Sequence, residues 1–132
     1  MHADAVDHVN LAFPADRLDE VIDFYVDRLG FETRFDDPHA AVADDPGLFP
    51  IAFGDDASLF VAPREDWERE SNFRHVAVRV PLAPEEVEAR LDDADIDVDN
   101  TAERERETTG PYTSYYVTDP FGYGLELMAV GD

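Results

Sequence analysis

The chain has 132 residues, which is enough for one compact domain and too few for two ordinary ones. Its composition, 44% hydrophobic and 11% aromatic, predicts a folded core and excludes a disordered tail. Acidic residues outnumber basic residues by 32 to 10, and the resulting net charge of −22 excludes nucleic-acid binding and binding to anionic membrane surfaces.

The charged residues have an unusual composition, because 20 of the acids are Asp, all ten basic residues are Arg, and Lys is absent. Like charges at this density destabilise the compact state unless salt screens them, and the screening length is about 10 Å at ~0.1 M salt. The Asp-rich, Lys-free composition is similar to that of proteins from salt-loving organisms. We favour that origin over an ordinary acidic protein.

The absence of Cys excludes disulfides, thiolate metal sites and a cysteine nucleophile. The first residues have neither a basic start nor an apolar run, so no signal peptide is expected. No stretch reaches the roughly 18 apolar residues of a membrane helix. We therefore expect a soluble, cytoplasmic protein.

The sequence contains an internal repeat of alternating apolar residues that begins with His-Val and ends at Pro. The copies are 8–14 and 75–81, and an offset of 67 residues separates both the histidines and the prolines. Each copy predicts a strand, because Pro cannot continue the ladder. Apolar residues spaced by three and four then predict a helix over 18–29, stopped by Gly30, and a second helix that begins at Pro84.

Three short strands are predicted after each helix, at 31–36, 49–53 and 58–62, and at 96–101, 113–118 and 124–130. Turns are predicted at 54–56 and 119–122, a mobile loop at 39–48, and a linking segment at 63–72 with a short helix around Trp67. The predicted fold is α+β, a single domain of two βαβββ modules, about 1–66 and 67–132. Paired side by side, the modules would form a curved mixed sheet around a cup-shaped site.

Strand alternation directs polar residues from three strands into this cup. On the first strand of each module the valines and their apolar neighbours face the helix, which leaves six residues for the cup: His8, Asn10, Ala12, His75, Ala77 and Arg79. On the last strand, Glu126 is the cup residue between Leu125 and Leu127.

A buried carboxylate without a partner is costly, and a divalent metal bound by His8, His75 and Glu126 would satisfy all three groups. Two His and one carboxylate form a known type of metal site. A His–Glu ion pair without a metal is the alternative. His2 and His39 are left out of the site, because the first is terminal and the second lies in the predicted loop.

Four segments, 7–9, 24–31, 74–77 and 119–127, resemble the vicinal oxygen chelate superfamily. This superfamily includes glyoxalase I, extradiol dioxygenases, and fosfomycin- and bleomycin-resistance proteins. The resemblance implies paired βαβββ modules and a divalent ion (Fe, Mn, Ni or Zn) held by His8, His75 and Glu126. It also implies a homodimer.

The sequence does not decide which branch of the superfamily the chain resembles most. Glyoxalase I has a fourth ligand on the last strand of the first module, where this sequence has Leu59, or Phe60 with a one-residue slip, and neither can ligate. Ser114 and Tyr116 resemble the Ser-x-Tyr segment of fosfomycin-resistance proteins, but the chain lacks the Lys that binds phosphonate there. An extradiol dioxygenase would need a further His, for which His39 is the candidate.

We favour a metal-dependent enzyme that chelates adjacent oxygens of a small-molecule substrate over a non-catalytic binder of the bleomycin-resistance type. The candidate substrate-binding residues are Asn10, Arg79 and Ser114, and the candidate proton donors are Tyr116 and Tyr123.

The charge of −22 predicts that folding depends on salt, because screening removes repulsion among the carboxylates. The midpoint of thermal unfolding should rise from low to molar KCl. A midpoint that stays flat or falls would contradict the halophilic interpretation.

Overall fold

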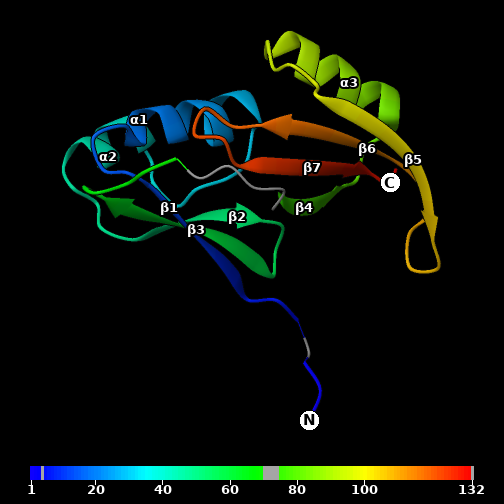
Figure 1. Ribbon diagram of the computed structural model, residues 1–132, viewed down its shortest axis with the longest axis horizontal. Helices are drawn as coiled ribbons and strands as arrows, with labels where there is room; N and C mark the ends of the chain where they lie inside the picture. The colour runs from blue at the N-terminus through cyan, green and yellow to red at the C-terminus, as the bar shows by residue number, and fades with distance from the viewer. Residues whose placement is uncertain (4, 70–74, 132) are drawn as a thin grey trace. The chain divides into compact units, whose positions relative to one another are not determined.

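The computed structural model describes residues 1–3, 5–69 and 75–131. The chain forms two compact units, Met1–Glu68 and Arg69–Asp132, and each contains one mixed sheet with its own helices (Figure 1). The predicted α+β class is therefore confirmed. No helix within the described ranges is long and apolar enough to cross a membrane.

Unit 1 contains a three-stranded sheet in the order β1-β3-β2. Strand β1 (His8–Pro14) runs parallel to β3 (Ala57–Arg64), and β2 (Phe49–Phe53) runs antiparallel to β3. Alternation along these strands buries one face, where Phe13, Leu59 and Val61 have no exposed surface. Apolar burial on this face holds the sheet against its helices.

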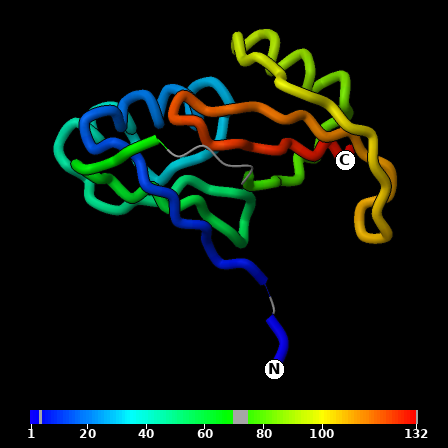
Figure 2. The backbone as a smooth tube through the Cα atoms, in the orientation of Figure 1, coloured from blue at the N-terminus to red at the C-terminus, as the bar shows by residue number. Residues whose placement is uncertain are grey.

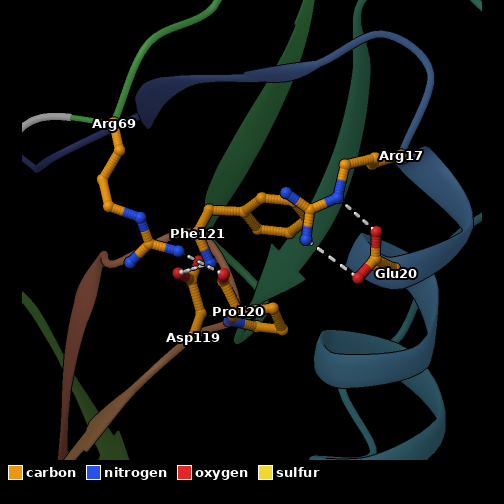
Figure 3. Close-up of polar contacts among 6 residues, drawn as sticks. All are labelled: Arg17, Glu20, Arg69, Asp119, Pro120 and Phe121. Carbon is orange, nitrogen blue, oxygen red and sulfur yellow. Dashed lines mark hydrogen bonds and ion pairs between the residues drawn. The ribbon is translucent and has the colours of Figure 1, made fainter.

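The first helix is confirmed, but it changes type along its length. It begins as α1 (Leu18–Val21), continues as the π-helix η1 (Ile22–Arg28), and ends before Gly30 at a φ of +80°. In the π part, the Leu29 N–H donates to the carbonyl of Phe24, five residues earlier, at 3.0 Å. An ion pair between Arg17 and Glu20 lies at the start of the helix (Figure 3).

Two expectations for residues 31–48 are wrong. The predicted strand 31–36 contains only one bridge, from Thr33 to Ile51, because the chain leaves the sheet to begin a helix. This helix, α2 (Pro38–Ala43), occupies part of the predicted mobile loop. The Asp37 side chain accepts a hydrogen bond from the Ala40 N–H at 3.3 Å, and Pro38 occupies the first turn. An Asp-Pro pair of this kind is a helix-start signal.

The expected helix around Trp67 is also wrong within the described residues, since 65–69 contain a turn and no helix, while 70–72 lie outside the described part. Strand β3 instead continues to Arg64, paired with β1. Pro63 fits there because β2 begins opposite Val61, so no residue of β2 pairs with Pro63 or needs its missing N–H.

Unit 2 contains a four-stranded sheet in the order β4-β7-β6-β5 (Figure 1). Its elements are β4 (His75–Val80), α3 (Pro84–Asp93), β5 (Asn100–Arg106), β6 (Gly110–Thr118) and β7 (Gly124–Ala129). Helix α3 packs on one face of the sheet with Val87 and Leu91 buried. The Tyr115 hydroxyl, which faces this helix, donates to the carbonyl of Pro84 at 3.1 Å.

The strand predicted at 96–101 lies further along the chain. Ile96 is buried and its N–H donates to the carbonyl of Leu91, so this residue closes the C-terminal end of α3. Strand β5 therefore begins at Asn100, and its hairpin with β6 turns back beyond Arg106 (Figure 2). The shift places Arg104 in the sheet.

One ion pair in unit 1 predicts a pH effect on stability. His39 of α2 lies with its Nε2 2.6 Å from Asp27 Oδ2 of η1. The hydrogen bond with Asp27, followed by its charge, raises the pKa of His39. Because the folded state favours the protonated ring, the stabilisation is complete below the unfolded pKa of about 6.5 and is lost as pH rises through the folded pKa.

His39→Gln should therefore lower the thermal midpoint more at about pH 5.5 than at about pH 8.5. Asp27→Asn, which keeps the histidine, should show the same pattern in the same melting experiment. An equal loss at both pH values would contradict this role for the pair.

Candidate functional site

The polar residues of unit 2 gather on the sheet face opposite α3. In the strand register, Glu126 of β7 lies between Ala77 of β4 and Tyr116 of β6. We call this surface the Glu126 face, and its members are His75, Ala77, Arg79, Asn100, Ala102, Arg104, Arg106, Gly110, Tyr112, Ser114, Tyr116, Thr118, Gly124, Glu126 and Met128.

Glu126 has a partner for each carboxylate oxygen. The Ser114 hydroxyl donates to Oε2 at 2.6 Å, and Oε1 lies 3.0 Å from Nε2 of His75. The Glu126 side chain is 7% exposed, and Ser114 has no exposed surface. A carboxylate buried to this degree needs such partners, because an unsatisfied charge costs several kcal/mol.

His75 contacts both the buried Glu126 carboxylate and the more accessible Tyr116. Its ring is 42% exposed and makes an edge-on contact with Tyr116, with ring centroids 5.9 Å apart. Sequence alternation predicted both His75 and Glu126 for one face, and within unit 2 the structure brings them into contact. Arg79 lies on the same face, exposed and four residues after His75 on β4.

The edge strand β5 adds a cation to the Glu126 face. Arg104 lies opposite Tyr112 in the register, and its interaction with the Tyr116 side chain is the main cause of its raised pKa. The Tyr112 hydroxyl is buried and has no hydrogen-bond partner among the described residues. These two groups were not among the predicted site residues.

A fixed turn positions the start of β7. Asp119, which is buried, accepts a hydrogen bond on Oδ1 from the N–H of Phe121 at 2.9 Å (Figure 3). The same oxygen accepts a second hydrogen bond from the N–H of Tyr123 at 2.8 Å. Arg69 donates to the carbonyl of Pro120 at 2.7 Å. The predicted turn 119–122 is confirmed, and the candidate proton donor Tyr123 has its backbone held by this turn two residues before Leu125.

In unit 1, His8 has a defined ring environment. Its Nδ1 lies 2.8 Å from Asp7 Oδ2, and the ring stacks on Phe60 with centroids 4.3 Å apart. A carboxylate on Nδ1 fixes the orientation of an imidazole and leaves Nε2 as the acceptor nitrogen. Asn10 lies on the same strand face as His8 and is exposed.

The register also locates the residue of unit 1 that corresponds to Glu126. Ala77, two residues after His75, pairs with Glu126, and Asn10, two residues after His8, pairs with Phe60. Phe60 therefore occupies the corresponding position, and Leu59, which the repeat offset favoured, is buried on the opposite face. A phenyl ring cannot ligate a metal, so unit 1 offers no carboxylate at this position.

The predicted metal ligands are distributed over both units, with His8 in unit 1 and the His75–Glu126 pair in unit 2. In the described part of the chain, no group of three or more His, Asp or Glu side chains is arranged as a metal site.

A family model described as Glyoxalase/Bleomycin resistance protein/Dioxygenase superfamily matches residues 5–127. The chain belongs to this superfamily. No protein of curated function matches it in sequence.

Several solved structures share the fold of this chain. A virulence protein from Salmonella typhimurium superposes with a TM-score of 0.70 at 21% identity, covering 97% of this chain and 98% of the other. A glyoxalase family protein from Enterococcus faecalis gives 0.63 at 22% identity, covering 96% and 98%. A glyoxalase/dioxygenase from Nostoc punctiforme gives 0.67 at 16% identity, covering 95% and 90%. At these identities the likeness shows the fold alone.

Arg104 and Tyr112 were not predicted as site residues. Because the predicted strand ended at residue 101, Arg104 fell outside the predicted sheet and its face was not assigned. The alternation of Glu and Arg over 103–106 was an available signal of an exposed edge strand.

Proposed function

We propose that this superfamily member is a metal-dependent enzyme that binds a small, oxygen-rich substrate through adjacent oxygens on a divalent ion. His75 and Glu126 would be the ligands from unit 2, and the family resemblance adds His8 as the third. The observation that carries the proposal is the 3.0 Å contact of His75 with a buried carboxylate that Ser114 holds from its other side.

The donor chemistry fits such an ion. Imidazole nitrogen and carboxylate oxygen suit Fe, Mn, Ni and Zn. Bonds of about 2.0–2.2 Å place two ligand atoms of one ion roughly 3–4 Å apart, and Nε2 of His75 lies 3.0 Å from Oε1 of Glu126. The Asp7 contact of His8 is the kind of outer partner that fixes a ligating imidazole.

The bound ion would supply Lewis acidity that stabilises negative charge on substrate oxygens. Ser114 holds Oε2 of Glu126 and thereby directs Oε1 toward His75. Tyr116, whose ring contacts His75 edge-on, would give or take a proton at its hydroxyl. We assign Asn10 and Arg79 to substrate orientation, and Tyr123 is the second candidate proton donor.

Phe60 helps to distinguish between the branches of the superfamily. Since it occupies the position that corresponds to Glu126, it supports a set of three protein ligands rather than the four of glyoxalase I. A dioxygenase-like or fosfomycin-modifying-like reaction fits three ligands. The competing proposal is a non-catalytic binder, which would not need the charge of Glu126.

Glu126→Gln keeps the side-chain volume and removes the charge, so divalent-ion affinity should fall by at least about 100-fold. Ser114→Ala removes only the hydroxyl that holds the carboxylate, and it should lower divalent-ion affinity about tenfold or more. The measurement is calorimetric titration of chelator-stripped protein in molar KCl with Mn, Ni and Zn separately.

Glu103→Gln is the matched control, because Glu103 is exposed on β5 and points to the opposite sheet face. It should bind each ion as the natural protein does. If no ion binds the natural protein, or if the Gln variants at 126 and 103 behave alike, the enzyme proposal fails and the binder proposal replaces it.

A further inference from the structure

We propose that Arg69 is a positioning residue for the candidate site. By holding the turn before β7, it closes the end of the β4–β7 ladder at which His75 lies and keeps His75 in contact with Glu126. The use of this contact to bind a metal ion rests on the proposed function. The hold on the ladder does not, because it is made by a contact of Arg69 with the backbone.

His75 lies where the parallel pairing of β4 with β7 begins. It is the first residue of β4, and it pairs with Gly124, the first residue of β7. The ends of strands open more readily than their centres. The chain also enters β7 through Gly122 and Gly124, and glycine gives the backbone the greatest conformational freedom. The position of His75 relative to Glu126 therefore depends on what holds the chain just outside this end of the ladder.

Arg69 contacts the turn just outside this end (Figure 3). Its Nη2 donates to the Pro120 carbonyl at 2.7 Å, and a Cβ at position 122 would lie 2.6 Å from its Nη1, so the guanidinium packs on the backbone of Gly122. In the sequence, Arg69 is six residues before His75. Pro120 is likewise six residues before Glu126. The contact therefore joins the two chain segments that lead to His75 and to Glu126.

Asp119 holds the same turn through different backbone groups. It accepts the N–H bonds of Phe121 and Tyr123, whereas Arg69 binds the carbonyl of Pro120. Because this carbonyl is neutral, molar salt weakens the Arg69 hydrogen bond less than it weakens an exposed ion pair. Side chains that form a binding site must be held to within about 0.5 Å, so a turn that shifts after loss of Arg69 would loosen the site.

Arg69→Ala removes the guanidinium and should loosen this end of the ladder alone. The measurement is amide hydrogen exchange by NMR on metal-free protein in molar KCl. Exchange of the Tyr123 N–H should become about fivefold or more faster, because its bond to Asp119 depends on the turn. The Val130 N–H, which donates to the carbonyl of Val80 at 3.1 Å at the other end of the ladder, should exchange as in the natural protein. A general loss of stability would instead speed the exchange of both amides.

Calorimetric titration of the same variant with Mn, Ni and Zn measures the effect on the site. Arg69→Ala should lower divalent-ion affinity about tenfold. Arg69→Lys keeps a charged donor for the carbonyl without the planar fork. It should have an intermediate effect in both experiments, and it serves if the Ala variant does not fold.

Arg90→Ala is the charge-matched control, because Arg90 is exposed on α3, and it should behave as the natural protein does in both experiments. Either of two results would overturn the proposal. One is a Tyr123 N–H that exchanges no faster in Arg69→Ala than in Arg90→Ala, or that speeds up only as much as the Val130 N–H. The other is faster exchange with unchanged affinity for an ion that the natural protein binds. If the natural protein binds no ion, the proposed function fails, and the exchange comparison by itself decides whether Arg69 holds this end of the ladder.

Discussion

The buried carboxylate of Glu126 imposes the strictest constraint on this fold. It lies on β7, which has β4 on one side and β6 on the other, and its two oxygens need partners from both strands. His75 supplies one from β4 and Ser114 the other from β6. A one-residue slip of either strand would turn its partner to the helix side and leave a charge unsatisfied. The strand register of unit 2 is therefore the one that gives the buried Glu126 carboxylate its two partners.

The parts of the fold that follow from local chemistry could be predicted from sequence. Proline ends the first strand of each unit, glycine ends the first helix, and the turn before β7 is held by Asp119. The errors lie where packing decides between alternatives. The segment 31–36 has strand-like residues but only the bridge at Thr33, and Ile96 is used to close α3 rather than to begin a strand. The π turns of η1 have no signature in an apolar spacing of three and four.

The candidate site also contains some features that the sequence predicted and others that it did not. Alternation was sufficient to place His75 and Glu126 on one face, because a strand has only two faces, whereas Ser114 was predicted only from the family resemblance. It could not show that the Ser114 hydroxyl binds Glu126, which depends on the diagonal offset between β6 and β7. Nor could it find Arg104 and Tyr112, since their pairing depends on where the β5–β6 hairpin turns. The repeat offset gave Leu59 where the register gives Phe60, a difference of one residue that changes the face.

An anomalous-difference map from crystals of the protein soaked with Mn or Zn would show whether His75 and Glu126 bind a metal ion. We expect a peak bonded to Nε2 of His75 and Oε1 of Glu126, with the Ser114 hydroxyl still on Oε2. A map with no peak there, in which His75 keeps its direct 3.0 Å contact with Glu126, would contradict the claim and leave the pair as a structural ion pair.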